Sequence, residues 1–181
     1  MIFKMTKTLE IETLKEKVTK ISGNQCNYYS EACIVLLEEL THSPGVFMYV
    51  DGDVRATYSL VWSTKPITSG WKAKAKLVEN AATAIAFFLV SEETDYTIIE
   101  EASIGTGVDY WLGYKEDHAL YDEDNFMNAR LEISGIRDDI SKIQGRLKKK
   151  LKQVTPTDST GLPAYVVIAE FGTLTAILSK K

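Results

Sequence analysis

The sequence predicts an α/β fold for the single domain of 181 residues, on three observations. First, from Trp71 onward the apolar spacing predicts the order helix, three strands, helix, strand. Second, the run from Ala164 to Glu170 is continuously apolar up to its last residue, as is typical of a strand covered on both faces. Third, a helix between two strands of one sheet requires a crossover connection, so we expect a partly parallel sheet.

The first 70 residues predict two helices and a hairpin. Residues 8–21 and 28–41 both carry apolar side chains at roughly helical spacing, and both are followed by helix-breaking residues. Residues 46–50 and 54–62 read as two strands joined by the turn signal at 51–53. We interpret residues 1–70 as an N-terminal extension of a core formed by residues 71–181.

The core elements follow in order. The helix expected over residues 71–92 is apolar on most sides in its second half, which indicates a buried helix. Strands are expected at residues 96–102, 107–114 and 129–136, with an acidic loop before the third. A helix over residues 137–154 stops before Pro156, and strands at residues 164–170 and 173–178 complete the chain.

Composition and charge exclude several classes of protein. The formal net charge is -4, which argues against a protein that coats nucleic acid generally. It leaves room for a local basic surface, since residues 142–152 hold six bases and no acid. The longest apolar run, residues 81–90, is too short to span a bilayer, and charged residues interrupt the apolar start of the chain. We therefore expect a cytoplasmic protein with no membrane partner.

Two carboxylates stand in otherwise apolar strands. Asp109 lies between Val108 and Tyr110, and Glu132 shares its strand face with Arg130 and Ser134. Burial of a carboxylate is costly unless it is paired or binds a cation. Carboxylates on two successive strands can meet in one cleft, and oxygen ligands of this kind suit Mg²⁺.

This element order, with an Asp on the second strand and Glu-x-(Lys) on the third, resembles the PD-(D/E)XK superfamily over residues 71–178. The resemblance implies a restriction-endonuclease-like core, with the order α-β-β-β-α-β and a central mixed sheet flanked by helices. It also implies that Asp109 and Glu132 bind Mg²⁺ or Mn²⁺, with Glu79 as an outer acidic group. The implied activity is metal-dependent hydrolysis of phosphodiester bonds in DNA or RNA.

Ser134 occupies the position of the family's lysine, so the positive charge must come from elsewhere. In the helix over residues 137–154, only Arg146 and Lys150 lie near the border of the apolar stripe, and the spacing does not favour their reaching the cleft. Arg130 is a further candidate, either for catalysis or for neutralising Glu132. Two alternatives stay open: a structural ion network of Asp109, Glu132 and Arg130, and a catalytically inactive nuclease fold that serves as a binding or assembly module. Residues 1–70 are in addition a candidate homodimer interface.

Overall fold

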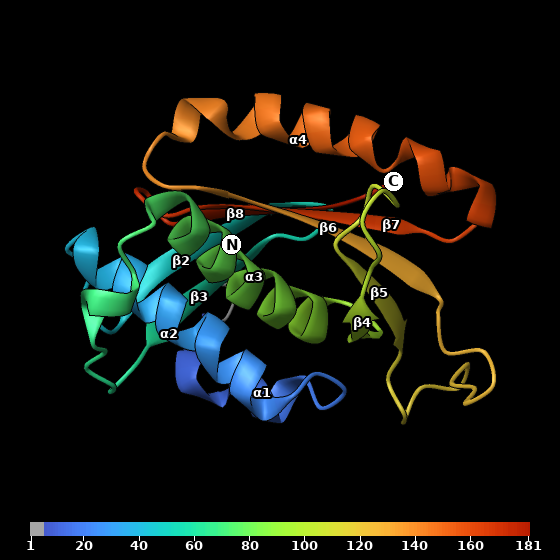
Figure 1. The fold of residues 1–181 in the computed structure, drawn as a ribbon, viewed down its shortest axis with the longest axis horizontal. Coiled ribbons are helices and arrows are strands. Elements are labelled where there is room, and N and C mark those ends of the chain that lie inside the picture. The colour runs from blue at the N-terminus through green and yellow to red at the C-terminus, as the bar shows by residue number, and fades with distance from the viewer. Residues whose placement is uncertain (1–5) are drawn as a thin grey trace, which may run out of the picture.

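The computed structural model describes residues 6–181, which form one mixed sheet with helices on both faces (Figure 1). The sheet order is β1-β3-β2-β8-β7-β6-β5-β4. The strands are β1 (Lys7–Glu10), β2 (Val46–Gly52), β3 (Ala56–Val61), β4 (Tyr96–Glu101), β5 (Tyr110–Tyr114), β6 (Ala129–Ile136), β7 (Ala164–Glu170) and β8 (Thr175–Lys180). The α-helices are α1 (Leu14–Lys17), α2 (Gly23–Glu39), α3 (Lys74–Glu93) and α4 (Ile143–Gln153), with short 3₁₀ turns between elements.

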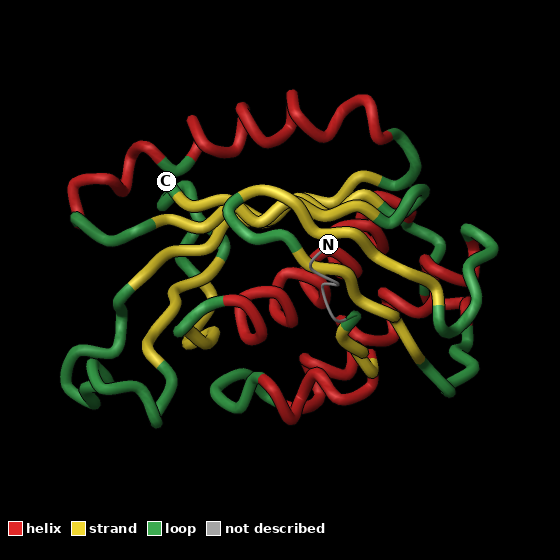
Figure 2. Tube along the Cα trace, turned by 180° about the vertical axis from the view of Figure 1, so that it is seen from behind, coloured by secondary structure: helices red, strands yellow, loops and turns green. Residues whose placement is uncertain are grey.

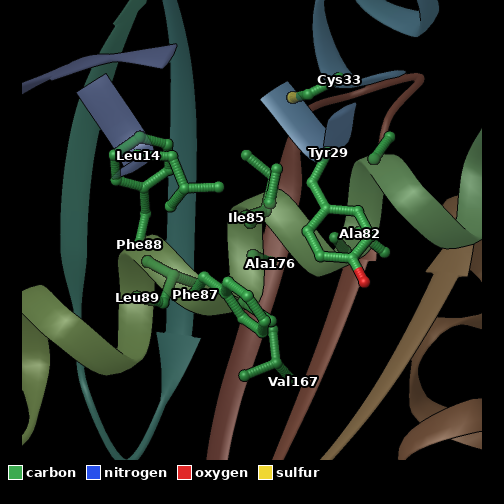
Figure 3. Close-up of a cluster of buried hydrophobic side chains, with 14 of the residues drawn as sticks. Leu14, Tyr29, Cys33, Ala82, Ile85, Phe87, Phe88, Leu89, Val167 and Ala176 are labelled. Carbon is green, nitrogen blue, oxygen red and sulfur yellow. The ribbon is translucent and has the colours of Figure 1, made fainter. Parts of the chain in front are cut away.

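The helices divide unequally between the two faces of the sheet. Helices α1, α2 and α3 lie on one face and α4 lies alone on the other (Figures 1 and 2). The apolar second half of α3 is buried between α2 and the sheet, where Phe87 points toward Val167 of β7 (Figure 3). A smaller apolar cluster lies beneath α4. The expectation that this long helix is buried is confirmed, because its apolar surface is wide enough to contact two layers. No helix in the described part of the chain has the length and apolar character needed to cross a membrane.

The elements expected after Trp71 are all present in the predicted order, but the N-terminal expectation was partly wrong. Residues 7–10 form the strand β1 instead of the start of a helix, and β1 pairs in parallel with β3. Leu9 is buried while its neighbours are exposed, which is the alternation of a strand. The hairpin of β2 and β3 also joins the main sheet, since β2 pairs in parallel with β8. The first 70 residues therefore extend the same sheet as the rest of the chain.

The divergence of β5 from β6 creates space for a site. Strand β5 pairs with β6 only as far as Leu131, whereas β7 pairs with β6 along its whole length from Arg130 to Ile136. Residues 132–136 of β6 consequently have no strand partner on the β5 side. Helix α3 approaches this free edge closely, because a Cβ atom on Gly135 would lie 2.6 Å from the carbonyl oxygen of Val78.

Candidate functional site

A cleft runs between α3 and α4 along the free edge of β6. Two adjoining cavities of about 600 Å³ and 380 Å³ form it, and both are lined by Glu79, Ser134 and Gln153. Asp109 and Glu132 line the smaller cavity, while Arg146 and Lys150 line the larger one. The predicted site residues of the second and third core strands are therefore found in one cleft, together with two bases of the following helix.

Glu132 is the most buried charged side chain of this cleft, with only 1% of its side chain exposed. It faces α4, where the amino group of Lys150 forms an ion pair with Oε1. The Gln153 side-chain amide donates a second hydrogen bond to the same oxygen, at 2.8 Å. The other oxygen, Oε2, is buried and has no hydrogen-bond partner in the described chain. A buried carboxylate with one unsatisfied oxygen is unusual and is a sign of a site that a proton or a cation completes.

Burial raises the pKa of Glu132 to about 7. Lys150 opposes this rise by favouring the charged form, and the negative charge of Asp109 adds to it. Ionised carboxylates only accept hydrogen bonds, so Glu132 and Asp109 can form a hydrogen bond with each other only when one of them is protonated. Glu132 is thus a buried carboxyl group whose raised pKa has a specific charged neighbour, a property that is enriched in functional sites.

Asp109 is held in place by the backbone of β6. Its Oδ2 accepts a hydrogen bond of 2.7 Å from the backbone N–H of Ile133, the first free amide beyond the pairing with β5. Its own N–H donates to the carbonyl of Leu131 at 2.8 Å. These two bonds continue the ladder past the end of β5 and fix the carboxylate beside Glu132.

Ser134 lies on the same face of β6, and its Oγ accepts a hydrogen bond of 2.8 Å from the guanidinium of Arg146. Spacing along the helix did not favour the entry of Arg146 and Lys150 into the cleft, but both side chains line it. The apolar stripe of α4 packs on the sheet at Ile143, Leu147 and Leu151, and the long stems of Arg146 and Lys150 curl around its border. Gln153 enters the cleft as well, three residues after Lys150 on the same helix face.

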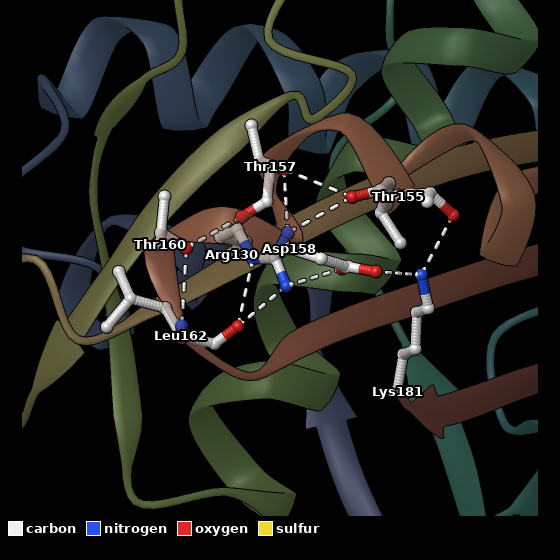
Figure 4. Close-up of polar contacts among 8 residues, drawn as sticks. Arg130, Thr155, Thr157, Asp158, Thr160, Leu162 and Lys181 are labelled. Atoms are coloured by element: carbon white, nitrogen blue, oxygen red, sulfur yellow. Dashed lines mark hydrogen bonds and ion pairs between the residues drawn. The ribbon is translucent and has the colours of Figure 1, made fainter.

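Arg130 does not pair with Glu132, which was one of the roles that the sequence left open for it. Its side chain is buried, and its nitrogen atoms make five hydrogen bonds with the segment after α4 (Figure 4). The acceptors are the Val154 carbonyl, the Leu162 carbonyl, the Thr157 hydroxyl and the Asp158 carboxylate. With all its donors engaged, Arg130 anchors this segment to β6 and has a structural role.

The residues expected to hold a metal ion are partly assembled. Asp109 and Glu132 are neighbours, and the unsatisfied Oε2 and the all-oxygen chemistry of the pair fit a divalent cation such as Mg²⁺ or Mn²⁺. Glu79, on α3, is exposed at the junction of the two cavities, and its carboxylate has no partner among residues 6–181. No group of three or more His, Cys, Asp or Glu side chains arranged to hold a metal is present in this part of the chain.

The assignment of these residues to a site depends on their geometry. Two carboxylates, two bases and an amide from three parts of the chain, the residue just before β5, strand β6 and helix α4, meet in one cleft, although they are up to 44 positions apart in the sequence, from Asp109 to Gln153. A search for relatives found no matching protein-family model, no matching curated protein and no matching solved structure.

Proposed function

We propose that this chain is a metal-dependent nuclease-like protein of the PD-(D/E)XK type, which hydrolyses phosphodiester bonds in DNA or RNA. In this proposal Asp109 and Glu132 hold Mg²⁺ or Mn²⁺, and Lys150 replaces the family's strand lysine, whose position is taken by Ser134. The observation that carries the proposal is the contact of the Lys150 amino group with the Glu132 carboxylate, in a cleft that Asp109 also lines.

The order of elements supports the proposal. Helix α3, strands β4 to β6, helix α4 and strand β7 follow one another in the chain, and the four strands are neighbours in the sheet in the same order. Strands β4 and β5 are antiparallel, as are β5 and β6, while β6 and β7 are parallel. A mixed sheet with one parallel crossover is the arrangement that the resemblance implies for residues 71–178.

Each polar residue of the cleft has a chemical task in this proposal. When bound, a divalent cation polarises the phosphate and lowers the pKa of an attacking water. Asp109 and Glu132 supply the oxygen atoms that hold it. Lys150 and Arg146 supply positive charge beside those carboxylates, where the negative charge of a reacting phosphate increases. The Ser134 hydroxyl orients Arg146.

A second candidate function is a catalytically inactive fold that binds a partner or assists assembly. The observation that favours it is the burial of Glu132, whose Oε1 already accepts bonds from two donors. Buried ion pairs are often retained for structural specificity without any catalytic role. The two candidates differ in one property, the affinity of the cleft for a cation.

Titration calorimetry with Mn²⁺ separates the candidates. We expect wild-type protein to bind Mn²⁺ at micromolar concentration and the double variant Asp109→Asn/Glu132→Gln to lose this binding. The matched control is Asp117→Asn/Glu123→Gln, which removes the same charge from exposed positions of the acidic loop and is expected to bind as wild type does. Binding that survives in the site variant would refute the metal assignment, and a folded wild type that binds no Mn²⁺ would favour the inactive module. Glu132→Gln alone should abolish Mn²⁺-dependent cleavage of DNA and RNA.

A further inference from the structure

The two halves of the cleft carry opposite charge. The larger cavity beside α4 is lined by six bases and three acids. Among residues 6–181, the smaller cavity is lined by four carboxylates, those of Glu79, Glu101, Asp109 and Glu132, and by no lysine or arginine. The halves meet at Ser134 and Gln153, so the boundary lies at the two carboxylates that are proposed to hold the metal.

The acidic half is closed at its far end. The loop between β4 and β5 rises to α4 (Figure 1), and it lines this cavity with Ser103, Ile104, Gly105 and Gly107. A Cβ atom on Gly107 would lie only 2.5 Å from the carbonyl oxygen of Gln153, so the loop backbone rests directly on the last turn of α4. Gly107 has a φ angle of 76°, which glycine adopts without strain. The opposite wall is formed by α2 and α3, through Tyr29 and Thr83.

The closed half contains a buried carboxylate beside a second one. The Glu132 side chain, 1% exposed, lines this cavity next to Asp109, and its Oε2 accepts no hydrogen bond from residues 6–181. The cavity volume of about 380 Å³ is in the range of small-molecule sites, roughly 300–1,000 Å³, and is far too small for a continuing nucleic-acid chain. A terminal nucleotide matches this size.

We infer that the cleft receives the end of a nucleic-acid strand, with the terminal nucleotide in the closed acidic half and the rest of the strand along the bases of α4. An internal segment carries phosphates on both sides of the bond that is cut. On one side those phosphates meet positive charge. On the other side they meet the loop that rests on α4 and the carboxylates of Glu79 and Glu101, which are not assigned to the metal. The inference rests on the proposed nuclease function and specifies its substrate as a free strand end.

The reaction is then removal of one nucleotide at a time. A water oxygen forms a bond to the phosphorus that links the terminal nucleotide to the chain. The existing bond from that phosphorus to the leaving sugar oxygen breaks, and this oxygen takes up a proton while the attacking water gives up one. One water is consumed for each mononucleotide released, and no oxidant or reductant takes part.

The test compares closed circular and linear forms of the same single-stranded DNA and RNA sequences, with the full chain and Mn²⁺. We expect mononucleotides from the linear form at a rate at least about tenfold above any cutting of the circle. Cutting of the circle at a similar rate would overturn this inference and leave the nuclease function standing. If neither form were cut, the nuclease function itself would fail, and the inference with it.

A charge variant tests the reason for the preference. Glu101→Lys places a base in the closed half, and we expect it to raise cutting of the circle relative to the linear form. The matched control is Glu100→Lys, the neighbouring exposed residue of β4, which does not line the cavity. An unchanged ratio in Glu101→Lys would show that charge in this cavity does not select strand ends, and a similar change in both variants would lead to the same conclusion.

Discussion

Replacement of Lys150 by Met is the sharpest test of the ion pair on which the proposed site depends. Methionine keeps an unbranched apolar stem but removes the amino group, so Glu132 loses the one cation that pairs with it among residues 6–181. Removing one member of a fully buried pair costs about 3–5 kcal/mol, because the other charge stays buried without compensation. Glu132 is fully buried, whereas 18% of the Lys150 side chain is exposed, so we expect the lower end, about 3 kcal/mol.

The loss depends on pH. Because burial raises the pKa of Glu132 to about 7, this carboxylate is charged at pH 8 and mostly protonated at pH 5. The full loss is therefore expected at pH 8, where it corresponds to a fall in Tm of roughly 6–12 °C for a domain of this size. At pH 5 the Glu132 carboxyl is mostly neutral and needs no compensating charge, so we expect Lys150→Met to lower the unfolding free energy by about 1 kcal/mol or less.

Denaturant unfolding of Lys150→Met and wild type at pH 8 and at pH 5 measures the loss of unfolding free energy at each pH, provided that the variant has the same denaturant slope as wild type. The control is Lys149→Met, an exposed neighbour that lines the same cavity, for which we expect a change within about 0.5 kcal/mol. If Lys150→Met and Lys149→Met had equal stabilities at pH 8, the reasoning about the buried pair would be refuted.

Three further predictions address the site and its support. In the folded wild type, Glu132 binds its proton more tightly than in the unfolded chain. Its contribution to the unfolding free energy is therefore lost as the pH rises from the ordinary carboxyl pKa of 4.5 to about 7. Glutamine at this position does not titrate, so Glu132→Gln does not show this loss. Between pH 5 and pH 8 the unfolding free energy of the variant relative to wild type should therefore rise by about 2.5 kcal/mol; a constant difference would contradict the raised pKa. Arg130→Met should cost about 3–5 kcal/mol, because it orphans the acceptors of five hydrogen bonds, whereas the exposed Arg55→Met should change little; equal midpoints in urea would rule out the anchoring role. Gly135→Ala should cost about 1–3 kcal/mol, since its Cβ would meet the backbone of α3, while Gly145→Ala, in open space on α4, should stabilise by about 0.5–1 kcal/mol; thermal melts that ranked the two variants in the reverse order would refute this account of the packing.

The expected homodimer through residues 1–70 stays a prediction. The hairpin of this segment is built into the sheet through the pairing of β2 with β8, so a dimer would use the outer surface of β1 to β3 and α1 to α2. Light scattering that gave the mass of a monomer would contradict it.

Much of the core could be predicted from periodicity. The apolar run of β7, the alternation along β6 and the apolar second half of α3 each depend on local residues, because burial on one face or two selects the pattern directly. The period of two in β6 also placed Glu132 and Ser134 on one face, and the structure has both facing α4. Asp109 is held beside them by the Ile133 backbone.

The remaining features depended on contacts between distant segments. Residues 7–10 form a strand because β3 offers them an edge, and four residues with helical spacing carry no local sign of that partner. The partners of Arg130 come from the turn after α4, which lies 24 to 32 positions further along the chain. The sequence by itself thus determined the core elements, their order and the strand faces that carry the two carboxylates, because burial acts on each residue locally. Only the tertiary structure decided that Lys150 and Arg146 enter the cleft, because their reach depends on how α4 lies across the sheet and on flexible stems that spacing along one helix does not describe.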